Sequence, residues 1–184
     1  MFDINAFSYT VVVLFIIAFG LWIASRIKKD VGIVDSFWSL MILTAGLCFM
    51  VLSETVITDR HSVVILLLTL WAIRLAFYIT WRNWGQEEDS RYQTIRKTNQ
   101  PNFEFKSLYI VFLLQAFLAV IVALPLMSIF SSNSDINVLD YLALALWLTG
   151  MFFESVSDLQ LLRFKSSHRN KDKVLNTGLW RYSR

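Results

Sequence analysis

Long runs of apolar residues, separated by short polar stretches, dominate the pattern of this 184-residue chain. Most runs are close to the length of about 20 apolar residues that a helix needs to cross the hydrocarbon core of a bilayer. The pattern predicts about five membrane-spanning helices, over Ser8–Ser25, Ile33–Leu52, Val63–Trp81, Leu108–Phe130 and Val138–Phe153. We therefore expect an all-α fold, a multi-pass integral membrane helix bundle with a cytosolic C-terminal segment.

The composition strengthens this interpretation. Hydrophobic residues make up 56% of the chain and charged residues 17%, and the mean hydropathy is +0.53. Soluble domains have about 45–50% apolar and about 25% charged residues. The positive charges Arg26, Lys28 and Lys29 follow the first run, so we expect this run to be a retained anchor and not a cleaved signal peptide. Nothing in the sequence divides the chain, and we expect a single membrane domain over residues 1–184.

The loops between the predicted helices differ sharply in charge. When alternate loops are assigned to opposite faces, fifteen of the seventeen Lys and Arg residues fall on one face, Arg60 falls on the other, and Arg74 lies inside the third run. Positively charged loops stay in the cytosol. We therefore expect an external N-terminus and a cytosolic C-terminus, with membrane lipids as neighbours. The net charge of +3 does not indicate a nucleic-acid partner, and the oligomeric state is left open.

Four ionisable side chains fall within or at the edge of these runs, namely Asp35, Arg74, Glu154 and Asp158. Near the middle of a bilayer such groups cost about 3 kcal/mol or more unless they are paired or hydrated. Asp35 either caps its helix or belongs to a site, and Arg74 either snorkels, forms a structural ion pair or belongs to a site. Glu154 and Asp158 share one helix face, where two carboxylates repel unless cations or ligand donors lie between them. This pair favours a functional role.

Two basic, aromatic stretches follow the third and fifth runs. The first, WRNWGQEEDSRYQTIRK at residues 81–97, is either a salt-bridged helix at the membrane surface with interfacial aromatic side chains or part of a site. From Arg163 onward the chain carries seven cations and one acid, with Trp180 and Tyr182 between them. This tail suits anionic lipid, or the phosphates and rings of a cofactor, better than nucleic acid. The chain contains neither a GxGxxG nor a P-loop motif.

Cysteine and histidine are scarce. The chain has one cysteine, Cys48, and two histidines, His61 and His168. A disulfide within the chain is excluded, and we expect no metal site because too few nitrogen and sulfur ligands are present.

Four stretches, in the order VDSFWS, EEDSRYQTIRK, FESVSDLQLLRFK and NKDKVLNTGLWRYSR, resemble the steroid 5-alpha-reductase-like membrane proteins, particularly their bacterial branch of unassigned function. The resemblance covers most of the chain, and the bacterial branch implies a location in a bacterial inner membrane. It implies a cytosol-facing pocket for NADPH, with hydride delivered to a carbon–carbon double bond conjugated to a carbonyl in a steroid-like or other lipidic substrate. The family's His-Pro-Asn-Tyr signature would begin just beyond Arg184. The resemblance therefore also implies a truncated chain, in which activity is reduced or lost.

The resemblance assigns roles to individual residues. Asp158 matches an aspartate on the cofactor side, and Lys165 takes the place of a basic residue that faces the cofactor. Tyr182 lies in the turn that leads into the signature. The cations offered to phosphate are Arg181 and Arg184. The residues expected on the substrate side are Asp35, Trp38 and Arg74.

The implied reaction also needs an acid. Hydride addition at the β-carbon builds negative charge on the carbonyl oxygen, and a proton donor must lie there. Burial raises the pKa of a carboxyl group, which makes Glu154 a candidate, and Tyr78 and Tyr92 are the alternatives. Two other functions stay open: an S-adenosylmethionine-dependent methyltransferase of the isoprenylcysteine carboxyl type, whose C-terminal architecture is similar, and a non-catalytic membrane remnant whose tail lies on lipid.

Overall fold

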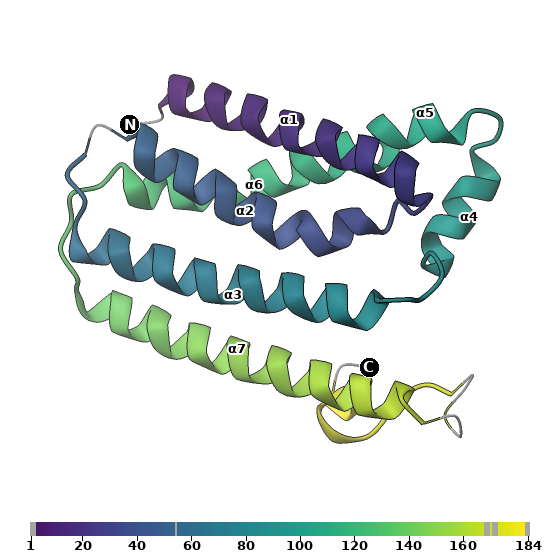
Figure 1. Cartoon of the computed structure of the whole chain (residues 1–184). Coiled ribbons are helices and arrows are strands. Elements are labelled where there is room, and N and C mark those ends of the chain that lie inside the picture. Colours follow the sequence, from purple (N-terminus) through teal and green to yellow (C-terminus); the bar gives the residue numbers. More distant parts are fainter. Residues whose placement is uncertain (1–2, 54, 168–169, 171–172, 183–184) are drawn as a thin grey trace. The chain divides into compact units, whose positions relative to one another are not determined.

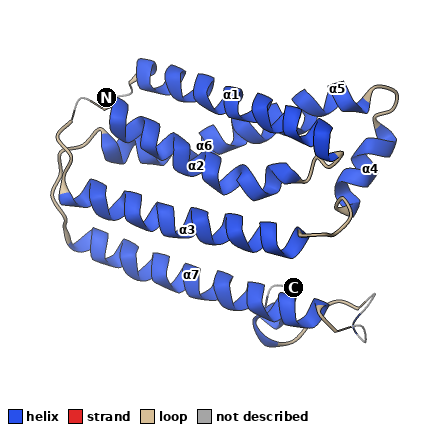
Figure 2. Ribbon diagram, in the orientation of Figure 1, coloured by secondary structure: helices blue, strands red, loops and turns tan. Residues whose placement is uncertain are grey.

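The computed structural model describes residues 3–53, 55–167, 170 and 173–182 of the chain. Its regular structure is helical, and these residues contain no β-strand (Figure 2). Five helical segments are long and apolar enough to cross a membrane, which confirms the predicted all-α, multi-pass class. These segments are Ile4–Lys28, Ile33–Leu52, Asp59–Asn83, Phe103–Phe130 and Val138–Lys165.

The chain divides into two compact units, Met1–Asp135 (unit 1) and Ile136–Arg184 (unit 2). Unit 1 contains α1 (Ile4–Lys28), α2 (Ile33–Leu52), α3 (Asp59–Asn83), α4 (Ser90–Thr98), α5 (Phe103–Ser107), the π-helical segment η1 (Leu108–Leu113) and α6 (Leu114–Phe130). Unit 2 contains α7 (Val138–Lys165) and the short 3₁₀ helix η3 (Gly178–Tyr182).

In unit 1 the long helices α1, α2, α3 and α6 run side by side, with α2 in contact with the other three (Figure 1). The short helices α4 and α5 lie together at one end of this bundle. We call that end the basic end of unit 1. Eight of its described residues are Lys or Arg, namely Arg26, Lys28, Lys29, Arg82, Arg91, Arg96, Lys97 and Lys106.

The core of unit 1 combines bulky side chains with small ones. Phe49, Phe112 and Phe130 are almost completely buried. Small residues let the helices approach closely, which favours van der Waals packing where the surrounding lipid offers no hydrophobic driving force. The fully buried alanines are Ala18, Ala45, Ala72, Ala116, Ala119 and Ala123. Gly46 of α2 acts in the same way, because a Cβ atom there would lie 2.7 Å from Leu68 Cδ2 of α3.

The opposite end of unit 1 is fastened by His61, which is buried. The Thr58 hydroxyl caps α3 by accepting a hydrogen bond from the His61 N–H at 3.4 Å, and the Thr58 N–H donates to His61 Nδ1 at 3.3 Å. Because Nδ1 accepts, the ring proton lies on Nε2, which is 2.9 Å from the carbonyl oxygen of Ser132 and 3.1 Å from that of Ile129. His61 therefore ties the start of α3 to the end of α6.

Several boundaries differ from the predicted runs. The third span begins at Asp59, four residues before the predicted start, and the fifth continues twelve residues beyond the predicted end, to Lys165. Glu154 and Asp158 therefore lie inside α7, where the helical spacing that places them on one face is kept. Residues 81–97 are not a single surface helix. They comprise the end of α3, a connection and most of α4.

Candidate functional site

Asp35 and Tyr92, 57 residues apart in the sequence, meet at the basic end of unit 1. Asp35 lies in the first turn of α2, and Tyr92 lies in the first turn of α4, whose start is capped by the Asp89 side chain. The Tyr92 hydroxyl donates to Asp35 Oδ1 at 2.6 Å. The interpretation of Asp35 as a helix cap is wrong, because Gly32 occupies the cap position and no side chain caps α2. The carboxylate instead links two helices.

Arg91 is the second partner of Asp35. Its Nη2 donates to Asp35 Oδ2 at 3.0 Å, and its Nε donates to Asp89 Oδ1 at 3.0 Å. The Arg91 side chain is 66% exposed, whereas that of Asp35 is 19% exposed. Asp35 therefore uses one oxygen to hold a buried phenol and the other to hold a guanidinium at the surface.

Tyr92 is the most deeply buried member of this group, at 6% exposure. Burial, together with the hydrogen bond to Asp35 and the charge of that carboxylate, raises the pKa of Tyr92 well above its ordinary value of 10. The phenol therefore stays protonated at neutral pH and acts as a hydrogen-bond donor. To serve as the predicted proton source, it would first have to leave Asp35.

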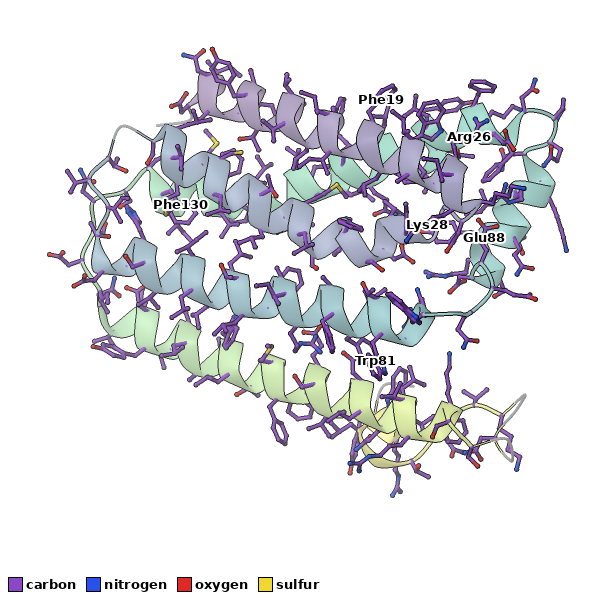
Figure 3. The ribbon with its side chains drawn as sticks, viewed as in Figure 1. Phe19, Arg26, Lys28, Trp81, Glu88 and Phe130 are labelled. Atoms are coloured by element: carbon purple, nitrogen blue, oxygen red, sulfur yellow. The ribbon has the colours of Figure 1, made fainter. Side chains whose placement is uncertain are left out.

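Glu88 and Arg96 hold α4 against the start of α2. Arg96 Nε and Nη2 donate to the two carboxylate oxygens of Glu88 at 2.9 and 2.8 Å, and the Val31 N–H donates to Oε1 at 2.9 Å (Figure 3 labels Glu88). The Arg96 guanidinium carbon also lies 4.7 Å from the ring centroid of Phe103. Burial acts to raise the pKa of Glu88, but the hydrogen bonds from Arg96 and Val31 outweigh it, and this pKa is lowered. Such a bidentate, charge-assisted contact fixes the orientation of α4 as well as its position.

Trp38 and Arg74 lie at similar depth on neighbouring helices of unit 1. The Ser39 hydroxyl of α2 donates to the carbonyl oxygen of Ala72 of α3 at 2.9 Å, which sets the register of the two antiparallel helices. Trp38 precedes Ser39 by one residue and Arg74 follows Ala72 by two, so both are displaced toward the basic end, by about 1.5 and 3 Å. Trp38 Nε1 and the Nε and Nη2 atoms of Arg74 are inaccessible to solvent.

Closer to the basic end, α3 presents aromatic side chains. The rings of Phe77 and Trp81 stack with centroids 6.0 Å apart (Figure 3 labels Trp81). On the adjacent face, the Tyr78 ring lies 5.7 Å from the guanidinium carbon of Arg82. A pocket of about 570 Å³, within the usual range for small-molecule sites, is lined by Phe77, Thr80, Trp81 and Trp84.

In unit 2 the two carboxylates of α7 lie on one helix face, as the sequence spacing predicts. Glu154 and Asp158 are four residues apart within an unbroken α-helix, and both are half-buried. Arg163 and Lys165 bring positive charge to the last turn of the same helix, where it complements the helix dipole.

The tail of unit 2 folds back onto α7. The Trp180 indole N–H donates to the carbonyl oxygen of Ser157 at 3.0 Å. The backbone N–H of Leu179 donates to Gln160 Oε1, also at 3.0 Å. Gly178 has a φ of +62°, a backbone conformation that favours glycine, and a Cβ atom there would lie 2.5 Å from Gln160 Oε1, so a larger residue would displace the Gln160 side chain. As a result, η3 lies beside the turn of α7 that contains Asp158.

The other predicted cofactor residues of unit 2 are exposed. Lys165 is the last residue of α7, and Arg181 and Tyr182 lie in η3, where Tyr182 is 81% exposed. Arg184 lies outside the described residues.

The predicted site residues thus form two groups. Those in unit 1 are Asp35, Trp38, Arg74, Tyr78 and Tyr92, and the described ones in unit 2 are Glu154, Asp158, Lys165, Arg181 and Tyr182. Sequence reasoning missed the partners that hold these residues, namely Glu88, Arg91 and Arg96 in unit 1 and Gln160 in unit 2. The acid and base alternation of residues 87–96 was the available signal, but it does not reveal which charges pair across helices.

Comparison with known proteins adds one finding. The sequence profile of a family described as "Protein of unknown function (DUF1295)" matches residues 21–184, a range that includes every predicted site residue. No curated protein and no solved structure matches the chain.

Proposed function

The chain belongs to the DUF1295 family, which is related in general to steroid 5-alpha-reductase-like proteins, and from this premise we propose that it is an NAD(P)H-dependent membrane oxidoreductase. Its substrate is a lipidic or steroid-like molecule with a carbon–carbon double bond conjugated to a carbonyl. We also propose that the chain belongs to the bacterial branch of that group.

The observation that carries this proposal is the fold of unit 2. The contacts of η3 with Ser157 and Gln160 bring a basic, aromatic segment to the turn of α7 that contains Asp158. A dinucleotide cofactor needs cations for its phosphates, an acceptor for its ribose hydroxyls or its amide, and flat surfaces for its rings. Unit 2 supplies each kind of group within one short stretch of structure.

The residues present fit NADPH by their chemistry. Lys165 and Arg181 are exposed cations suited to phosphate, and Asp158 can accept hydrogen bonds from ribose or amide. Tyr182 offers an exposed ring. The cofactor, when bound, supplies the hydride. The protein must then orient the substrate, exclude water and provide a proton.

Three residues are the proposed sources of that proton. Glu154 lies one helical turn from Asp158, while Tyr78 and Tyr92 belong to unit 1. Tyr92 is protonated at neutral pH and donates its hydroxyl proton in a hydrogen bond to the Asp35 carboxylate, so loss of this proton to a substrate would leave two anionic groups next to each other. We therefore favour Glu154 or Tyr78, and assign Asp35, Trp38 and Arg74 to the polar part of the substrate. The aromatic residues lining the 570 Å³ pocket suit its apolar body.

Cofactor binding by the detergent-purified protein tests this proposal. We expect NADPH to bind, and Asp158→Ala to raise its Kd by about tenfold or more, because a hydrogen bond to a charged group contributes about 1.5–3 kcal/mol. Asp135→Ala, an exposed acid in a loop of unit 1, is the matched control and should leave the Kd unchanged. Binding of S-adenosylmethionine without NADPH would favour the methyltransferase alternative. Binding of neither would contradict both.

A further inference from the structure

The indole N–H of Trp38 is buried without an acceptor. Trp38 packs against the core of unit 1, its Nε1 atom is inaccessible to solvent, and no hydrogen-bond partner for it exists among the described residues. A buried donor that lacks an acceptor costs about 1–3 kcal/mol, and most such donors in native proteins therefore have a partner. This one calls for an explanation.

The polar groups near Trp38 along α2 and α3 are already used. Asp35, one turn toward the basic end, directs its two oxygens to Tyr92 and Arg91. The adjacent Ser39 hydroxyl donates to the carbonyl oxygen of Ala72. The carbonyl oxygens of α2 take part in its own helical ladder. An acceptor for Trp38 therefore has to come from outside this set.

Trp22 shows the usual arrangement in the same unit. Its Nε1 donates to the carbonyl oxygen of Glu104 at 2.9 Å, joining α1 to α5. The chain can thus satisfy a tryptophan N–H within the bundle. The unsatisfied N–H of Trp38 is therefore not a general property of tryptophan side chains in this bundle.

The indole N–H of Trp38 can only donate. It has no acceptor capacity, so its complement is an oxygen that accepts, such as a carbonyl oxygen.

We propose that Trp38 Nε1–H donates a hydrogen bond to the carbonyl oxygen of a lipid ketone bound in unit 1. This contact sets the depth of the ligand in the bundle, about 4.5 Å along α2 from Asp35. The inference rests on the proposed function for the class of ligand. It identifies the atom of the protein that recognises the substrate carbonyl.

The test compares Trp38→Phe with Trp22→Phe in detergent without NADPH. The probes are cholest-4-en-3-one and the hydrocarbon cholest-4-ene, and the readout is the shift in Tm by circular dichroism. Without a probe, Trp38→Phe should lower the Tm less than Trp22→Phe does, because both remove part of a packed ring but only Trp22→Phe also breaks a hydrogen bond. The ketone should raise the Tm of the wild type and of Trp22→Phe more than the hydrocarbon does. Trp38→Phe should lose this difference, with about a tenfold weaker apparent Kd for the ketone.

A second measurement does not depend on how the variant folds. A hydrogen bond lowers the carbonyl stretching frequency of the bound ketone, so infrared difference spectra of the wild type should show a lowered band. Absence of that band, an equal effect of the two probes on the wild type, or ketone stabilisation of Trp38→Phe equal to that of the wild type overturns the inference. Because NADPH is left out, these outcomes are independent of the cofactor titration.

Discussion

At the scale of single residues, the hydrogen bond between Tyr92 and Asp35 is the contact whose loss is easiest to measure. Tyr92→Phe removes one hydroxyl and keeps the ring in its buried position. Because the acceptor is a carboxylate, we expect the free energy of unfolding to fall by about 2 kcal/mol. Tyr109→Phe, at a side chain that is 57% exposed, is the control and should change it by less than about 0.5 kcal/mol. Equal effects of the two substitutions in detergent would contradict the prediction.

The stability difference between the wild type and Tyr92→Phe should depend on pH in a defined direction. The pKa of Tyr92 is higher in the folded protein than in the unfolded chain. Its contribution to stability is therefore fully present below about pH 10 and is lost as the pH rises from there through the folded-state pKa. The difference in Tm between the wild type and Tyr92→Phe should stay constant from pH 7 to about pH 10 and shrink above it. Other tyrosine and lysine side chains titrate in both the wild type and Tyr92→Phe, so their effects on the Tm cancel in this difference.

The sequence could identify Asp35 and Tyr92 as unusual, but it could not pair them. A carboxylate at the edge of an apolar run is visible because of its cost in lipid. The partner lies 57 residues away on a helix whose direction depends on how Glu88 and Arg96 fasten it. The sequence could not predict that Trp38 Nε1 lacks an acceptor, because this lack depends on the position of every polar group around that nitrogen atom.

At the scale of elements, the close approach of α2 and α3 depends on Gly46. A Cβ atom at this position would lie 2.7 Å from Leu68 Cδ2 and 3.2 Å from Leu126 Cδ1, so a larger residue must push both neighbours aside. We expect Gly46→Leu to lower the free energy of unfolding by about 1–3 kcal/mol. Gly20→Leu on α1 is the matched control, because nothing lies within 4 Å of a Cβ atom there. Thermal unfolding followed by circular dichroism should separate the two variants, and equal Tm values would refute the packing argument.

The existence of the five long helices could be predicted from the sequence, because a bilayer fixes their length and requires them to be apolar. The boundaries could not, because α7 continues to Lys165 on polar residues that the hydropathy pattern places outside the span. Nor could the pattern show that α4 turns its tyrosine inward, or that α6 is preceded by the π-helical segment Leu108–Leu113. These features arise from contacts between helices, which local periodicity does not contain.

At the scale of the whole molecule, the distribution of charge predicts how the protein lies in its membrane. The basic end of unit 1 holds eight Lys and Arg residues, whereas Arg60 is the one described Lys or Arg residue at the other end of the bundle. Positively charged segments are retained on the cytosolic side. The basic end, with Asp35, Tyr92 and the α4 helix, is therefore predicted to face the cytosol.

Cysteine labelling tests this orientation. In a Cys48→Ser background, which removes the one native thiol, Ser90→Cys places a thiol at the exposed start of α4 and Asn133→Cys places one in the exposed loop after α6. We expect a membrane-impermeant maleimide to label Asn133→Cys in intact spheroplasts and to label Ser90→Cys only after permeabilisation. Cys48→Ser alone should stay unlabelled. The reverse pattern would place the basic end outside the cell and would contradict the predicted orientation.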